Sequence, residues 1–120
     1  MANVLTVDDS VSLRKLVAST LVTVGHSVTE AANGQDALVR IKECKFDLII
    51  SDLNMPIMDG LTFIRNVRIV AAYKHTPILV LTTEMDPAKK KEAKESGATG
   101  WIVKPFDPPQ LLATIRKVLG

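Results

Sequence analysis

Short runs of apolar residues alternate along the chain with longer segments in which apolar residues recur every three or four positions. The runs at 48–50 and 78–81 contain no polar residue, which is typical of strands buried on both faces of a sheet. The longer segments have the period of helices that bury one side. This alternation predicts an α/β protein, a doubly wound parallel sheet with helices on both faces and right-handed crossovers.

Five strands are predicted, each followed by a helix. The strands cover 4–7, 28–31, 48–50, 77–81 and 101–103. The run at 28–31 contains Thr29 and Glu30 and is the most polar, so we expect it at the edge of the sheet. Pro77 opens the fourth strand, where a missing N–H is tolerated.

Cap residues predict where the helices begin. The first helix is capped by Asp9 or Ser10, the second by Asn33, the fourth by Asp86 ahead of Pro87, and the last by Asp107 in a pattern that resembles a capping box. The apolar face of the first helix is predicted to consist of Leu13, Leu16, Val17, Leu21 and Val24, and the last helix packs Leu111, Leu112, Ile115 and Leu119. The helix after Pro87 is mostly Lys, Glu and Ala, so we expect it to be loosely held.

Composition bounds the class of protein. A length of 120 residues favours a single domain, 1–120, and 47% hydrophobic residues exclude a disordered chain. The net charge of +2 has interspersed signs, so neither a nucleic-acid-binding arm nor a polybasic membrane surface is expected. The apolar runs are too short to cross a membrane, and no signal pattern precedes the first strand. Cys44 is the only cysteine, which predicts a packing role for it and a cytoplasmic location for the protein.

Polar residues stand where the buried strands end. Asp8 and Asp9 follow the first strand, Asp52 the third, Thr82 and Thr83 close the fourth, and Lys104 follows the fifth. Because the carboxyl ends of parallel strands share one edge, these side chains converge there, where ligands bind in open α/β sheets.

The chemistry of this group of side chains follows from its charges. Carboxylates about 4 Å apart repel by roughly 4 kcal/mol at an effective dielectric constant of about 20. Lys104 supplies one compensating charge, and Mg²⁺, which prefers oxygen ligands, supplies more; there is no cluster of His or Cys that would favour zinc. A carboxylate is itself a nucleophile toward phosphorus and forms an aspartyl phosphate. Taken singly, Asp8 and Asp9 are helix caps, Asp52 is a turn former and Lys104 a surface lysine, and only their joint placement favours a site.

The sequence resembles the receiver domain of two-component response regulators, and among them the CheY-type single-domain chemotaxis regulators. The motifs that carry the resemblance are VDDS at 7–10, SDLNMP at 51–56, MDG at 58–60, LT at 81–82 and KPF at 104–106. The resemblance implies a flavodoxin-like (βα)5 fold with strand order 2-1-3-4-5. Its implied roles are Asp52 as phosphoacceptor, Asp8, Asp9, Asp52 and the carbonyl of Asn54 as ligands of Mg²⁺, Thr82 as switch hydroxyl, Lys104 as phosphate-binding cation, and a cis Pro105. Trp101 stands at the switch position where the family often has Tyr or Phe.

The implied function is that of a phosphorelay response regulator. Its partners would be a histidine kinase of the CheA type, a target such as the flagellar motor switch, and a phosphatase, with no nucleic acid and no membrane bound. The protein would act as a monomer and catalyse only its own phosphorylation and dephosphorylation. The face formed by the helix after Pro87, the fifth strand and the last helix is expected to bind the target.

Three alternatives remain open at this stage. One is a stand-alone phosphorelay intermediate or phosphate sink. Another is a haloacid-dehalogenase-like phosphatase, which needs a second aspartate where this chain has Asn54. The third is a nucleotide- or flavin-binding domain, but the Walker and G-x-G-x-x-G patterns are missing, and three acidic residues would repel a phosphate without a metal.

Overall fold

The strands form one parallel sheet in the order β2-β1-β3-β4-β5, which confirms the predicted fold class and strand order. The computed structural model describes residues 2–120; Met1, part of the predicted domain 1–120, lies outside the described residues. The strands are β1 (Asn3–Val7), β2 (Ser27–Ala31), β3 (Leu48–Ser51), β4 (Ile78–Thr82) and β5 (Gly100–Val103). As expected, the most polar strand, β2, lies at an edge, because an edge strand is less completely covered than a central one.

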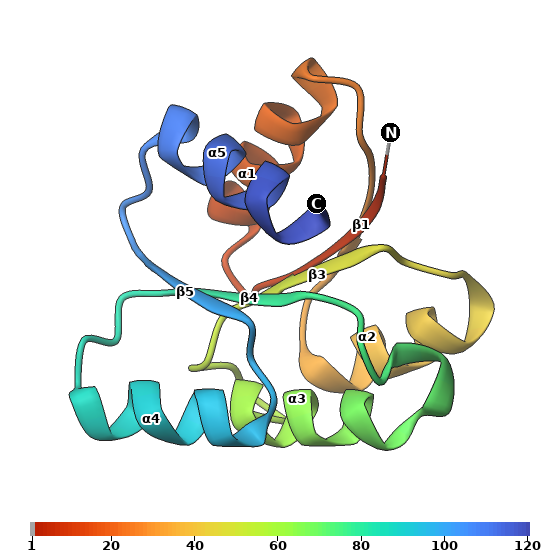
Figure 1. Ribbon diagram of the computed structural model, residues 1–120, viewed down its shortest axis with the longest axis vertical. Helices are drawn as coiled ribbons and strands as arrows, with labels where there is room; N and C mark the ends of the chain where they lie inside the picture. Colours follow the sequence, from red (N-terminus) through yellow and green to blue (C-terminus); the bar gives the residue numbers. More distant parts are fainter. Residues whose placement is uncertain (1) are drawn as a thin grey trace.

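Helices cover both faces of the sheet (Figure 1). One face carries α1 (Val11–Thr23) and α5 (Pro108–Leu119), and the other carries α2 (Gly34–Glu43), α3 (Gly60–Ile69) and α4 (Pro87–Ser96). A short 3₁₀ helix, η1 (Ala71–Tyr73), connects α3 to β4. Within residues 2–120, no helix combines the length and the apolar character needed to cross a bilayer.

Alternate strand residues feed two hydrophobic cores. Ile50 and Leu79 pack with Leu21 of α1 and Leu111 of α5. Ile49 and Val80 pack on the opposite face with α2, α3 and Ala93 of α4. Because successive side chains of a strand point to opposite faces, strands without polar residues fill both cores. This burial keeps the central strands in register, so that their carboxyl ends lie side by side.

The predicted caps are largely confirmed. Side-chain oxygens of Ser10, Asn33 and Asp86 accept hydrogen bonds from the first turns of α1, α2 and α4. Asp107 is the N-cap residue of α5, but its side chain accepts no capping bond, so the predicted capping box is wrong. Pro109, the second residue of α5, lacks the N–H that Ala88 donates to Asp86 at the corresponding position of α4.

Three packing predictions are wrong. Leu16 and Val24 are 52% and 43% exposed, and only Val17 and Leu21 of α1 are buried. Leu16 is rotated by about 100° from Val17 around the helix axis, and Val24 follows the last helical residue. Cys44 is exposed, because it caps the end of α2 and Phe46 takes the buried place instead.

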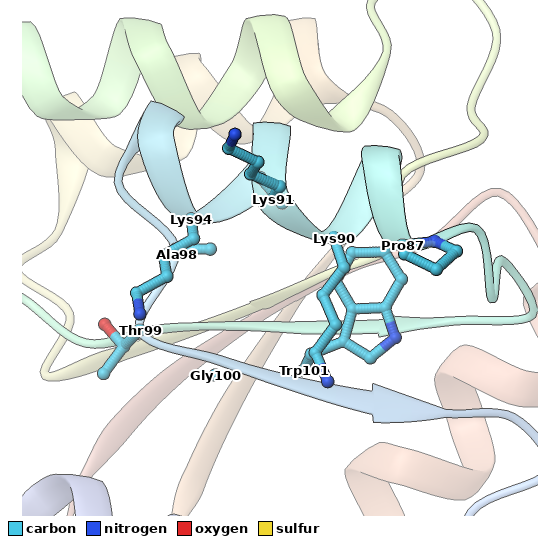
Figure 2. A pocket seen from close by; sticks show the side chains of 9 residues that line it. Pro87, Lys90, Lys91, Lys94, Ala98, Thr99, Gly100 and Trp101 are labelled. Atoms are coloured by element: carbon cyan, nitrogen blue, oxygen red, sulfur yellow. The ribbon is translucent and has the colours of Figure 1, made fainter.

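The expectation of a loosely held α4 needs correction at its C-terminal end. Ala93 is its one buried residue. Beyond it, Gly97 adopts a left-handed conformation (φ 119°), and its carbonyl accepts hydrogen bonds from Nε and Nη2 of Arg68, at 3.1 and 2.7 Å. The side of α4 that faces β5 borders a cavity of about 430 Å³ (Figure 2). The helix is therefore anchored at one end and borders a cavity along its length.

Candidate functional site

The β1–α1 turn places two carboxylates at the carboxyl edge of the sheet. Asp8 follows the last residue of β1 and is 5% exposed, and its N–H donates to Ala31 O of β2. Its Oδ1 accepts the N–H of Ser10 at 2.9 Å, which closes a tight turn. Asp9 in this turn is exposed. One carboxylate is thus locked into the protein, while its neighbour is open to solvent.

Asp52 occupies the same edge directly after β3. It is 7% exposed, and its Oδ1 accepts the N–H of Leu53 at 2.6 Å and that of Asn54 at 3.4 Å. Gly60 passes so close that a Cβ on it would lie 2.2 Å from the carbonyl oxygen of Asp52. Only a glycine fits there. Gly60 therefore lets the start of α3 pack directly against the backbone of Asp52.

Lys104 joins the two buried carboxylates. Its Nζ donates to Asp8 Oδ2 at 2.7 Å and to Asp52 Oδ2 at 2.8 Å. Burial alone would lower the pKa of Lys104, but the hydrogen bonds to Asp52 and Asp8 outweigh it, so its pKa is raised. The peptide bond between Lys104 and Pro105 is cis, as the resemblance implied.

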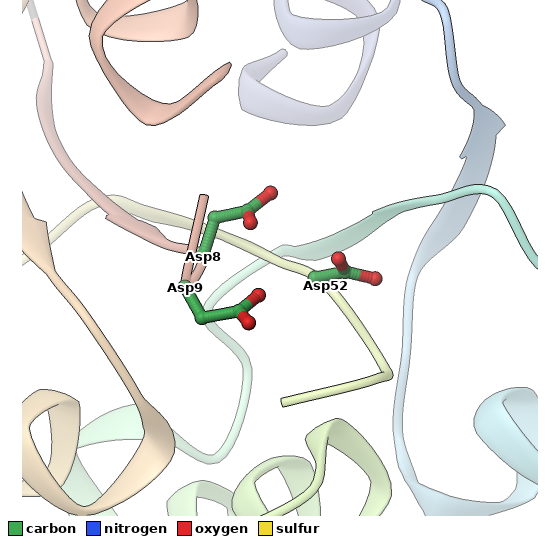
Figure 3. A group of neighbouring side chains, drawn as sticks. All are labelled: Asp8, Asp9 and Asp52. Carbon is green, nitrogen blue, oxygen red and sulfur yellow. The ribbon is translucent and has the colours of Figure 1, made fainter. Parts of the chain in front are cut away.

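The three carboxylates form one cluster. Figure 3 shows the side chains of Asp8, Asp9 and Asp52 projecting from the ends of two strands into the same region, and one oxygen from each lies within 4.8 Å of the others. Three carboxylates with one ammonium group leave an excess of negative charge, which favours a further cation. An all-oxygen donor set with one open carboxylate fits Mg²⁺, which keeps several waters when it binds.

Thr82 and Asn54 also lie at the carboxyl edge of the sheet, at the end of β4 and after β3. Thr82 is the last residue of β4 and is buried, and its hydroxyl oxygen accepts the N–H of Glu84 at 3.2 Å. Thr83 is exposed. The structure therefore turns Thr82 inward and Thr83 outward. Asn54 is exposed on the loop that follows Asp52.

Trp101 lies apart from the carboxylates. It pairs with Val80 in the sheet and is half-buried, as expected for a strand residue of this size. Figure 2 shows its indole ring beside Pro87 and Lys90 in the cavity between α4 and β5. Lys90, Lys91 and Lys94 also line this cavity, so it has both an aromatic and a basic lining.

Sequence reasoning missed a polar pair behind the β1–α1 turn. Arg14 donates to the carbonyl oxygen of Asp8 at 2.7 Å and to Glu30 Oε1 at 2.9 Å. Burial alone would raise the pKa of Glu30, but the bonds from Lys15 and Arg14 outweigh it and lower that pKa. The sequence offered one signal, the acidic Glu30 in a predicted strand. The bond from Arg14 to the carbonyl of Asp8 could not be predicted, because every residue has a backbone carbonyl.

Comparison with known proteins identifies the class of this fold and site. Residues 4–116 match the response regulator receiver domain, and the chain belongs to this family, whose members serve two-component signalling. Among its relatives, the chemotaxis protein CheY-3 of Vibrio cholerae is 36% identical over 116 residues, which covers 96% of this chain and 89% of that protein. The CheY homolog of Campylobacter jejuni is 38% identical over 120 residues, covering 97% and 91%. The crystal structure of CheY4 of Vibrio cholerae superposes with a TM-score of 0.95 at 53% identity and 98% coverage of both chains.

Proposed function

We propose that Asp52 accepts a phosphoryl group from the phosphohistidine of a histidine kinase. The observation that carries this proposal is the contact of one lysine with both Asp8 and Asp52 beside the open carboxylate of Asp9. A carboxylate oxygen of Asp52 would attack phosphorus, the P–N bond would break, and its electron pair would go to the departing imidazole. Lys104 would stay beside the transferred group and balance its charge.

Asp8, Asp9, Asp52 and the carbonyl oxygen of Asn54 would hold Mg²⁺. When bound, the ion neutralises charge on the phosphoryl oxygens. The protein would catalyse no reaction other than its own phosphorylation and dephosphorylation. It would act as a monomer in the cytoplasm, where kinases use ATP. The fit of the donor set, described above, supports this assignment.

The test uses acetyl phosphate with Mg²⁺ as the phosphodonor and intact-mass spectrometry as the readout. Wild type should gain one phosphoryl group and Asp52→Asn none, because the amide is not a nucleophile. Asp59→Asn is the matched control: Asp59 lies in the same loop, but its carboxylate caps α3 through Thr62 and lies outside the cluster. Undiminished labelling of Asp52→Asn would refute the assignment.

We infer further that phosphorylation switches a protein-binding face in chemotaxis, as the names of the relatives suggest. The face consists of α4, β5 and α5, and its cavity is lined by Trp101 and by Lys90, Lys91 and Lys94 of α4. The phosphoryl group would draw the hydroxyl of Thr82 away from the N–H of Glu84, and Trp101 and α4 would follow as a shift between two populations. A shift from 1:99 to 99:1 needs about 5.5 kcal/mol. One hydrogen bond to a charged group supplies roughly 1.5–3 kcal/mol, so Lys104 and the metal must contribute.

Thr82→Ala should accept phosphate normally but transmit it poorly. The measurement is the affinity of the phosphorylated variant for the flagellar motor switch protein, beside that of phosphorylated wild type. Thr83→Ala, which changes an exposed hydroxyl next along the chain, should behave like wild type. Equal affinities for Thr82→Ala and wild type would remove Thr82 from the relay. A phosphorylated wild type with no gain in affinity would favour a phosphate sink instead.

A further inference from the structure

The β1–α1 turn is tied to the edge strand β2 from both sides of Asp8. On one side, the N–H of Asp8 donates to the carbonyl oxygen of Ala31 at 3.1 Å. On the other side, Nη1 of Arg14 donates to the carbonyl oxygen of Asp8 at 2.7 Å, while Nε of the same guanidinium donates to Glu30 Oε1 at 2.9 Å. Arg14 therefore links the turn to β2 through a rigid, planar group.

This link is largely buried. The side chain of Arg14 is 12% exposed and that of Glu30 is 23% exposed. Lys15 also binds Glu30, through Oε2 at 2.9 Å, but its side chain is 66% exposed and its ammonium group donates no hydrogen bond to the turn. Two cations thus share one carboxylate, and only Arg14 also reaches the site.

The bond from Arg14 holds the backbone that carries Asp9. The carbonyl of Asp8 belongs to the peptide unit that joins Asp8 to Asp9, and a peptide unit is planar. Holding this carbonyl fixes the plane and with it the Cα position of Asp9. Because Asp9 is the exposed member of the carboxylate cluster, it depends on the backbone for its position.

We propose that Arg14, oriented by Glu30, is a positioning residue that preorganises Asp9 for Mg²⁺. The inference rests on the proposed Mg²⁺ site and goes beyond its ligands. The direction in which Mg²⁺ affinity changes distinguishes positioning from a simple effect of charge. Arg14→Gln removes a positive charge near a cation site, so charge alone would tighten Mg²⁺ binding, whereas loss of positioning weakens it.

The experiment is a Mg²⁺ titration of the full chain, followed by the amide NMR signals of residues 8–10 and 52–54. Arg14→Gln should raise the Kd for Mg²⁺ about tenfold, the lower end of what loss of a ligand-orienting contact costs. Arg14→Lys, which keeps the charge but cannot donate along two fixed directions, should lie in between. Lys15→Gln, which removes the other cation from Glu30, should leave the Kd unchanged.

A second readout separates positioning from a general structural role. The rate at which Arg14→Gln is labelled by acetyl phosphate should be low at limiting Mg²⁺ and should return to the wild-type rate at saturating Mg²⁺. A misfolded site would stay slow at every concentration and would overturn the proposal, as would a Kd equal to or below that of wild type. If Arg14→Gln does not fold, Arg14→Lys decides by the same two measurements. A wild type that binds no Mg²⁺ would refute the proposed metal site and this inference together, whereas normal wild-type binding with an unaffected variant would refute this inference alone.

Discussion

The carboxyl edge and the amino edge of the sheet, where the strands end and begin, each hold a cation. The partners of the two cations differ. At the carboxyl edge, Lys104 contacts the carboxylates of Asp8 and Asp52. At the amino edge, where helices lead into strands, Arg68 contacts backbone carbonyls only. Its shortest hydrogen bonds, each 2.7 Å, go to the carbonyl oxygens of Gly97, Tyr73 and Thr76, and a longer one of 3.4 Å goes to that of Lys74.

The difference decides which edge can respond to a ligand. Backbone carbonyls carry no net charge and belong to the folded chain. Arg68 therefore fastens the residue after α4 to the loop before β4 and leaves no excess charge that would attract a ligand. Burial lowers the pKa of Arg68, while hydrogen bonds to carboxylates raise that of Lys104 against the effect of burial. At the carboxyl edge, three carboxylates outnumber one ammonium group, and this excess attracts a further cation. The amino edge therefore stabilises the fold, whereas the carboxyl edge can bind a further cation.

Tyr73 closes the amino edge further. Its hydroxyl oxygen lies 2.8 Å from the carbonyl oxygen of Cys44 and accepts the N–H of Phe46 at 3.2 Å. Lys45 lies over its ring, 4.2 Å from the centroid, and donates to the carbonyl of Ala72. Burial raises the pKa of the Tyr73 hydroxyl, which stays a neutral donor at physiological pH. These contacts pair the hydroxyl of Tyr73 and the ammonium group of Lys45 with neutral groups.

The largest expected effect is on the stability of Lys104→Met. Removing the cation leaves two buried carboxylates unpaired, which should cost about 3–5 kcal/mol of unfolding free energy at neutral pH. Mg²⁺ should restore part of this loss, because it replaces the missing charge. Urea unfolding with and without Mg²⁺ measures both quantities.

Lys104→Arg is the matched variant, since it keeps the charge. We expect it to retain most of the stability but to lose activation by phosphorylation, because a planar guanidinium differs in shape and reach from an ammonium group. A fully active Lys104→Arg protein, or a Lys104→Met protein as stable as wild type, would contradict the role given to this lysine.

Arg68→Met tests the opposite edge. The carbonyls that it leaves behind should cost about 3 kcal/mol, the upper end for hydrogen bonds to a charged group. Mg²⁺ should not restore this loss, and labelling of Asp52 should persist. Arg65→Met is the control on the same helix: its side chain is 54% exposed and contacts Ser96 and Glu92, so its cost should stay below about 0.5 kcal/mol. Equal losses for the two variants would erase the distinction between a buried anchor and a surface contact.

The smallest expected effect is on pH dependence. The pKa of Lys104 is raised, so its contribution to stability is complete below its ordinary value of 10.5 and is lost as the pH rises through the higher folded value. The pKa of Glu30 is lowered, so its contribution is complete above 4.5 and is lost as the pH falls through the lower folded value. Glu30→Gln should therefore flatten only the acid limb of a stability profile measured by urea unfolding. An unchanged acid limb would show that the ion pairs of Glu30 add nothing measurable.

Much of the fold and of the candidate site could be predicted from the sequence. Apolar runs locate the strands, and Ser10, Asn33 and Asp86 mark helix starts by a local bond to the next turn. The parallel order then brings the residues after β1, β3 and β5 to one edge. Predictions from local chemistry failed at Asp107, because Pro109 lacks the N–H that a cap would bind, and at Cys44, because it lies at the end of α2.

The order of the elements and the presence of Asp8, Asp9, Asp52 and Lys104 at strand ends follow from the sequence alone, because hydrophobic period and chain direction are properties of neighbouring residues. The partners of Arg14 and Arg68, in contrast, depend on how the elements pack. Arg14 meets Glu30 across 16 residues of chain, and Arg68 meets Gly97 across 29. Most of their acceptors are backbone carbonyls, which every residue possesses, so no side-chain pattern distinguishes the carbonyl that will be bound. Packing alone brings such a carbonyl and a buried guanidinium together.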